Sequence, residues 1–162
     1  MPSYSPVEEI LNVSSHALGF VLSIVASIAL LARAITLGDS LYLVSFGIFG
    51  FSLLFLYGSS TIYHRTKNMI LRGKLRVLDH ASIYVLIAGT YTPFTLITLQ
   101  GATGWIIFGA CWAMALTGII LKFFFTGRYK LLSTLMYVFM GWLILFAIGP
   151  LIEKFPAEGM NW

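Results

Sequence analysis

The chain alternates between long apolar runs and short segments that carry nearly all of its charged residues. Five runs come close to the roughly 20 mostly apolar residues that a helix needs to cross the hydrocarbon core of a bilayer. Transmembrane β-strands alternate apolar and polar positions, and these runs do not. Because every backbone polar group in lipid needs an internal partner, the pattern predicts five transmembrane helices. They cover about residues 14–33, 41–64, 80–99, 103–122 and 130–152.

The composition supports the same class of protein. Of the 162 residues, 59% are hydrophobic and 10% are charged, and the mean hydropathy is +0.90. A soluble chain of this size could not bury so much apolar surface, and a disordered chain would be far more polar. We therefore expect an all-α integral membrane protein whose residues 1–162 form a single transmembrane helical domain. Its one cysteine, Cys111, excludes an intrachain disulfide framework.

The basic residues are unevenly divided between the two sides of the predicted bundle. Eight of the ten Lys and Arg residues lie in segments 65–77 and 122–130, and the opposite side has only Arg33 and Lys154. The positive-inside rule makes both basic segments cytoplasmic, which places the N-terminus in the cytoplasm and Trp162 outside. These segments are interpreted as topology determinants near anionic headgroups and not as a nucleic-acid site. No basic region precedes the first apolar run, so we expect no cleaved signal peptide.

A few polar side chains remain at the ends of the predicted spans, and the topology puts all of them at cytoplasmic ends. Residues four apart share a helix face, and all three histidines of the chain fall in this layer. Ionisable groups at membrane depth are costly and indicate function. Imidazoles and carboxylates from separate helices are typical metal ligands. The candidate residues are Glu9, Asn12, His16, Ser60, His64, Asp79 and His80.

Each candidate also has a purely structural interpretation, and the residues alone leave both open. Asp79 at the start of the third span would cap free N–H groups of the helix. The histidines could lie at the interface as amphipathic side chains, Glu9 could be solvated, and Ser60 could make an interhelical hydrogen bond. Only the shared layer favours a site.

Three stretches together resemble one family. They are residues 9–16 (EILNVSSH), residues 60–64 (STIYH), and residues 78–84 (LDHASIY) followed by residues 88–93 (AGTYTP). The combination is similar to the hemolysin III branch of the progestin and adipoQ receptor family, over the whole chain. The resemblance implies a seven-helix bundle with a cytoplasmic N-terminus and a zinc site near the cytoplasmic face. It identifies His64 as a zinc-binding residue, Asp79 as the partner of the metal-bound water, and Ser60 as the serine one turn before His64. The family's helix-one motif matches at Glu9, Asn12 and His16.

The chain departs from the family in one respect. The family supplies two further zinc ligands from a His-x-x-x-His pair in its seventh helix, and this sequence has no histidine after His80. It ends where the sixth helix would begin, so it corresponds to five of seven helices. We expect this chain by itself to carry little or no Zn²⁺ at His64 and to be inactive.

The implied function of the complete protein is zinc-dependent hydrolysis of a lipid amide or ester. His64 would bind the metal, Asp79 and Ser60 would be catalytic, and the candidates for supporting the metal from a distance are Glu9, Asn12, His16 and His80. A receptor-like or structural protein with a structural zinc would use the same ligands, so it stays open. A lytic pore-former is disfavoured, because no charged stripe runs through any span. The expected partners are membrane lipids and a lipid substrate, and no nucleic acid is expected. We expect a multi-pass protein of the bacterial plasma membrane.

Overall fold

The computed structural model describes residues 5–125 and 130–154, and all regular structure within them is helical. The long helices are α1 (Pro6–Leu37), α2 (Ser40–Arg65), α3 (Met69–Pro93), α4 (Gly101–Phe125) and α5 (Lys130–Trp142). Helix α3 continues as the π-helix η1 (Phe94–Leu99). Helix α5 continues through the 3₁₀ segment η2 (Leu143–Ala147) into the short helix α6 (Ile148–Lys154).

Five helical stretches within the described residues are long and apolar enough to cross a membrane. This confirms the predicted all-α membrane fold with five spans. The stretches are Pro6–Leu37, Ser40–Arg65, Met69–Leu99, Gly101–Phe124 and Leu131–Glu153. Arg128, in residues 126–129, and the C-terminal segment 155–162, to which topology assignments were also made, lie outside the described residues.

Local sequence signals explain where the first helices begin and end. The Ser5 backbone N–H donates to the Glu8 carboxylate at 2.6 Å, and the Glu8 N–H donates to Ser5 Oγ at 3.2 Å, which forms a capping box. Gly38 ends α1 with a left-handed φ of +72°, and Asp39 immediately caps α2. Such short connections make α1, α2 and α3 antiparallel neighbours.

Helix α3 begins at Met69, well before the apolar run that predicted it near residue 80. Asn68 Oδ1 accepts hydrogen bonds from the N–H groups of Ile70 and Leu71 at 3.0 and 3.1 Å and caps the helix. Only residues 66–68 connect α2 to α3, so most of the basic segment is helical. The capping interpretation of Asp79 is therefore wrong, because Asp79 lies in the helix interior. Hydropathy detects the part of a helix in hydrocarbon and misses charged turns that extend beyond it.

Two of the spans change helix type along their length. At Pro93, whose missing N–H removes one helix hydrogen bond, α3 gives way to η1, and the Gln100 N–H bonds to the Thr95 carbonyl at 3.2 Å, five residues back. The Thr95 hydroxyl donates to the Tyr91 carbonyl at 2.8 Å and so supplies one backbone group with a partner. The break in the fifth span at η2 falls in an entirely apolar sequence and was not predicted.

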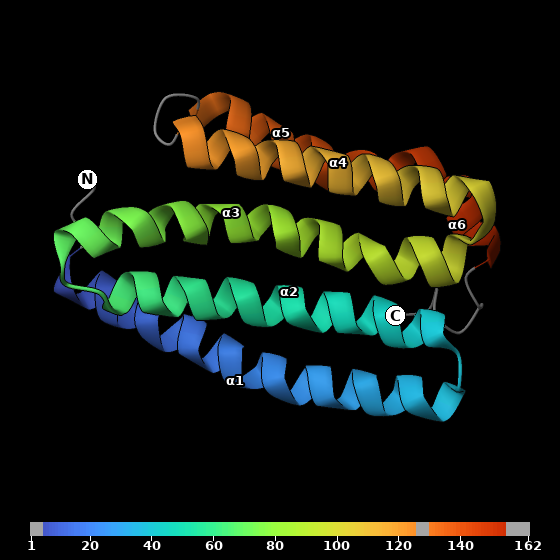
Figure 1. Ribbon diagram of the computed structural model, residues 1–162, viewed down its shortest axis with the longest axis horizontal. Helices are drawn as coiled ribbons and strands as arrows, with labels where there is room; N and C mark the ends of the chain where they lie inside the picture. Colours follow the sequence, from blue (N-terminus) through green and yellow to red (C-terminus); the bar gives the residue numbers. More distant parts are fainter. Residues whose placement is uncertain (1–4, 126–129, 155–162) are drawn as a thin grey trace.

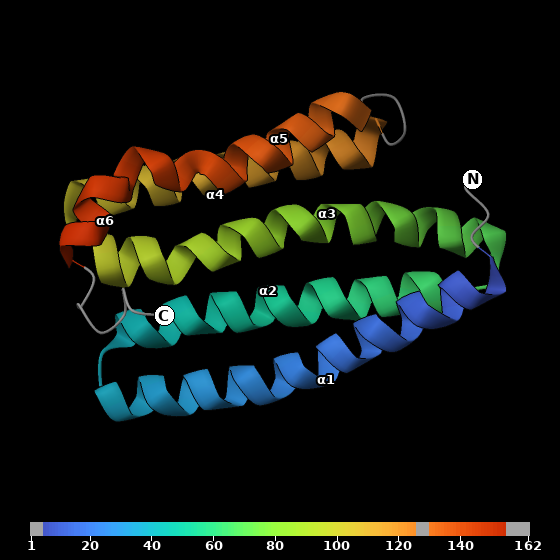
Figure 2. The ribbon, with the colours of Figure 1, turned by 180° about the vertical axis from the view of Figure 1, so that it is seen from behind.

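The helices form a bundle in which α1, α2 and α3 lie side by side, with α4 and α5 beyond α3 (Figures 1 and 2). The start of α1, the end of α2 and the start of α3 meet at one end of the bundle, on the left in Figure 1. The apolar core lies between α3, α4 and α5. Its buried residues are Tyr84, Ala88, Tyr91, Leu99, Ile107, Cys111, Ala115, Met140, Leu143 and Ala147.

Candidate metal centre at the common end of three helices

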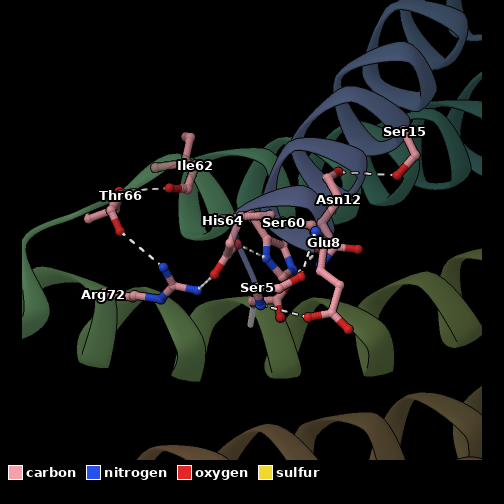
Figure 3. A network of polar contacts seen from close by, with 11 residues as sticks. Ser5, Glu8, Asn12, Ser15, Ser60, Ile62, His64, Thr66 and Arg72 are labelled. Atoms are coloured by element: carbon pink, nitrogen blue, oxygen red, sulfur yellow. Dashed lines mark hydrogen bonds and ion pairs between the residues drawn. The ribbon is translucent and has the colours of Figure 1, made fainter. Parts of the chain in front are cut away.

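The Glu9 carboxylate connects three helices at this end of the bundle. Its Oε2 lies 2.9 Å from Nδ1 of His64 on α2, and its Oε1 accepts a hydrogen bond from Nη2 of Arg72 on α3 (Figure 3). The side chains of His64, Arg72 and Glu9 are 10%, 16% and 21% exposed. The predicted proximity of Glu9 and His64 is thus present, and Arg72 completes a partly buried network of charged and polar groups.

The ring of His64 is also enclosed by its neighbours. The His16 ring stacks on it with the centroids 5.8 Å apart and the planes 8° from parallel. On α2 itself the Tyr63 ring meets His64 edge-on at 4.7 Å. His16 therefore belongs to the same cluster as His64, and that imidazole has one aromatic neighbour from α1 and one from α2.

Ser60 and Asp79 form a direct contact between α2 and α3. The Ser60 hydroxyl donates to Asp79 Oδ1, and Ser60 is 6% exposed. A second link lies beside it: Ser59 Oγ is 3.1 Å from Ser82 Oγ, and the Ser82 hydroxyl donates to the Asp79 backbone carbonyl at 2.6 Å. Ser60 is one helical turn before His64, so Asp79 is brought next to the turn that carries the imidazole.

Two of the candidate residues lie apart from these contacts. The contact that His80 makes is through its backbone carbonyl, which accepts from the Tyr137 hydroxyl of α5 at 2.9 Å. The Asn12 backbone carbonyl accepts from the Ser15 hydroxyl at 3.1 Å within α1. Within the described residues neither side chain makes a hydrogen bond to Glu9, His64 or Asp79, although the His80 ring lies within electrostatic range of Asp79. The proposed support of a metal by Asn12 and His80 stays a prediction.

Arg72 and Tyr63 belong to the network and were not among the sequence candidates. The Arg72 guanidinium lies 5.0 Å from the centre of the Tyr63 ring and also donates to the Thr66 carbonyl at 3.5 Å. Arg72 was interpreted only as a topology determinant. A partly buried carboxylate such as Glu9 requires a cationic or hydrogen-bonding partner, and this requirement would have directed attention to the nearest basic residues.

Comparison with known proteins identifies the relationship. Residues 4–162 match the family described as haemolysin-III related. The chain belongs to the haemolysin III family. This family is part of the progestin and adipoQ receptor family, so the resemblance drawn from the motifs is confirmed.

Two relatives show how close the similarity is. The chain is 44% identical over 154 residues to Hemolysin-3 of Bacillus cereus, which covers 95% of this chain and 70% of the relative. It is also 44% identical over 154 residues to the Hemolysin-3 homolog of Bacillus subtilis (strain 168), with 95% of this chain and 72% of the relative covered. No solved structure matches the chain.

The donor atoms of this haemolysin III protein fit part of a zinc site. An ionised carboxylate can only accept, so Nδ1 of His64 donates to Glu9, and a neutral ring in this arrangement carries its lone pair on Nε2. Metal-binding histidines typically donate their second nitrogen to a carboxylate in this way. However, residues 5–125 and 130–154 contain no group of three or more His, Cys, Asp or Glu side chains that could hold a metal ion. His64 therefore fits as one ligand, and a complete site needs donors from outside the described residues.

Proposed function

We propose that this haemolysin III protein is a zinc-dependent hydrolase of the bacterial plasma membrane that cleaves a lipid amide or ester. The observation that carries the proposal is one arrangement at the end of α2. An imidazole held by a carboxylate, His64 with Glu9, lies one turn from a serine that donates to a second carboxylate, Ser60 with Asp79. Ionisable groups at the end of membrane-spanning helices are costly, and a catalytic role explains why they are gathered there.

The residues of this chain would divide the work as follows. His64 would hold Zn²⁺ through Nε2, and the ion supplies Lewis-acid chemistry that polarises a carbonyl and makes a water molecule more acidic. Asp79 would act as general base and take the proton from the attacking water. Ser60 would hold the Asp79 carboxylate in one orientation through its hydroxyl. The lipid substrate would reach these groups from the bilayer, against which the outward apolar side chains of the helices lie.

The test is elemental analysis of the purified full-length protein together with turnover of a ceramide-like amide and a lipid ester. We expect the wild type to contain zinc and His64→Ala to lose it. Asp79→Ala should retain most of the metal and lose hydrolysis. Glu8→Gln is the matched control, because Glu8 closes the capping box with Ser5 in an exposed position, and it should retain zinc. A wild type without zinc, or equal zinc in wild type and His64→Ala, would overturn the proposal.

One observation favours a structural role as the second candidate. Glu9 already links α1, α2 and α3 through His64 and Arg72, so a zinc ion bound there could serve as a further link between helices. In that case His64→Ala would lose zinc and stability, and wild-type protein with full zinc content would hydrolyse neither lipid. The turnover measurement therefore separates the two functions, although they share the same ligand.

A further inference from the structure

The two adjacent glutamates at the start of α1 have different partners. Glu8 closes the capping box with Ser5 in an exposed position. Glu9 points across the bundle, where its two oxygens bond to different residues, His64 on α2 and Arg72 on α3. Capping therefore does not account for Glu9, whose carboxylate is placed between an imidazole and a guanidinium.

Arg72 is itself held from three directions. Its guanidinium donates to Glu9 and to the Thr66 carbonyl, and it lies over the face of the Tyr63 ring at 5.0 Å. A planar guanidinium presents its donors in a fixed fork, so fixing Arg72 also fixes the Glu9 carboxylate. The Tyr63 ring in turn packs edge-on against His64, which closes the loop of contacts back to the imidazole.

We infer that Glu9, fixed by Arg72, is a positioning residue that sets the tautomer and ring orientation of His64, so that Nε2 is the nitrogen offered to a metal. The carboxylate holds the proton on Nδ1, and the parallel His16 ring restricts rotation of the imidazole. The inference extends the proposed zinc function to two residues, Glu9 and Arg72, and rests on that function for its effect on metal binding. Its effect on the tautomer of His64 does not depend on zinc.

The experiment uses the full-length protein and the variant Glu9→Gln, with Glu8→Gln as the matched control. A glutamine can offer either its carbonyl or its amide group to Nδ1, so it no longer selects one tautomer. The first measurement is the ¹⁵N NMR spectrum of the imidazoles in metal-free protein, with the His64 signals assigned by their loss in His64→Gln. The second is the dissociation constant for Zn²⁺ from competition with a chelating dye.

We expect wild type and Glu8→Gln to hold His64 in the tautomer protonated at Nδ1, and Glu9→Gln to show a mixture of tautomers. Zinc affinity should fall about 10–100-fold in Glu9→Gln, the usual effect of losing a group that orients a metal ligand. Arg72→Lys keeps the charge and loses the fork, so it should shift both readouts in the same direction by a smaller amount. It also serves as the second variant should Glu9→Gln fail to fold.

The outcomes separate this inference from the proposed function. An unchanged His64 tautomer in both Glu9→Gln and Arg72→Lys would overturn the inference, even if zinc binding weakened through general loosening of the helices. A changed tautomer with unchanged zinc affinity would overturn it as well. A wild type that binds no zinc at His64, combined with a tautomer change in Glu9→Gln, would support the positioning of the ring and overturn the hydrolase proposal.

Discussion

The two interfaces of α3 are built from different kinds of side chain. On the side of α2, the helix interfaces bury small polar residues of α1, α2 and α3, and they include Ser23, Ser27, Ser45, Ser52, Ser59, Ser60 and Ser82. Toward α4 and α5 the buried residues are apolar or aromatic and include large side chains, and the rings of Tyr84 and Tyr137 lie with centroids 4.3 Å apart. Small residues allow helix backbones to approach closely in a membrane. The side of α3 that faces α2 carries the ionisable cluster. The side that faces α4 and α5, called the aromatic side below, carries contacts of neutral tyrosine hydroxyls.

This difference indicates what each side does. On the aromatic side, the Tyr91 hydroxyl bonds to two backbone groups at the break in the fifth span. It donates to the Gly141 carbonyl and accepts from the Ile144 N–H, both at 2.9 Å. On the α2 side of α3, Glu9, Arg72 and Asp79 are ionisable, and ionisable groups close to the hydrocarbon are costly to hold. Stability and metal chemistry should therefore respond to different substitutions.

The largest expected effect is on helix spacing. A Cβ added at Gly89 of α3 would lie 2.2 Å from Ser52 Oγ of α2, and one added at Gly118 of α4 would lie 2.3 Å from the buried Tyr84 ring. Both Gly89→Ala and Gly118→Ala should destabilise the protein by about 1–3 kcal/mol through overpacking. Only Gly89→Ala moves α3 from α2 and so separates Ser60 from Asp79. Unfolding in a detergent series and zinc titration measure the two effects.

The control for both glycine variants is Gly109→Ala, because among the described residues an added Cβ would meet nothing within 4 Å beyond the adjacent residues and backbone of its own helix. It should leave both stability and zinc affinity near the wild-type values. If Gly118→Ala weakened zinc binding as much as Gly89→Ala, the two interfaces would not be separable.

The next effect concerns the hydroxyl that bridges the break in the fifth span. Tyr91→Phe removes one donor and one acceptor and leaves the Gly141 carbonyl and the Ile144 N–H without that partner. Interhelical hydrogen bonds in membranes contribute about 0.6 kcal/mol on average and up to about 1.7. We expect a loss of about 1–2 kcal/mol in the unfolding free energy, with zinc content unchanged in elemental analysis. A loss of zinc would link this break to the cluster at the other interface.

The sequence predicts the five spans because hydrocarbon requires long apolar helices, and that requirement is independent of packing. It does not predict the start of α3 at Met69, because Arg72 and the basic residues that follow it interrupt the apolar pattern but not the helix. The 3₁₀ segment Leu143–Ala147 carries no proline or polar residue of its own, but Pro150 follows it and has no N–H to donate to the Phe146 carbonyl, a signal that the hydropathy pattern does not show. Its break is stabilised by Tyr91, a residue far away in sequence.

The candidate cluster was predictable in part, because the order of the spans fixes which helix ends lie on the same side of the membrane. Spacing of four residues and a common membrane side were enough to group Ser60 with His64 and to expect Glu9 and Asp79 nearby. The pairing of Glu9 with Arg72 depends on side-chain reach between the first and third helices, which no local pattern encodes. His80 shared the layer in sequence, and its backbone carbonyl accepts a hydrogen bond from Tyr137 of α5, which no local pattern encodes.

The smallest expected effect tests the link between Ser60 and Asp79. Ser60→Ala removes the hydroxyl that donates to Asp79 Oδ1, and Ser59→Ala removes the neighbouring hydroxyl that lies 3.1 Å from Ser82 Oγ. Both serines are buried in the same turn, so each variant should lower stability by about 0.6 kcal/mol. Only Ser60→Ala releases the carboxylate proposed as general base, and it should lower lipid hydrolysis about 10-fold while zinc content stays constant. Equal hydrolysis rates in the two variants would show that this contact joins the helices without orienting Asp79 for chemistry.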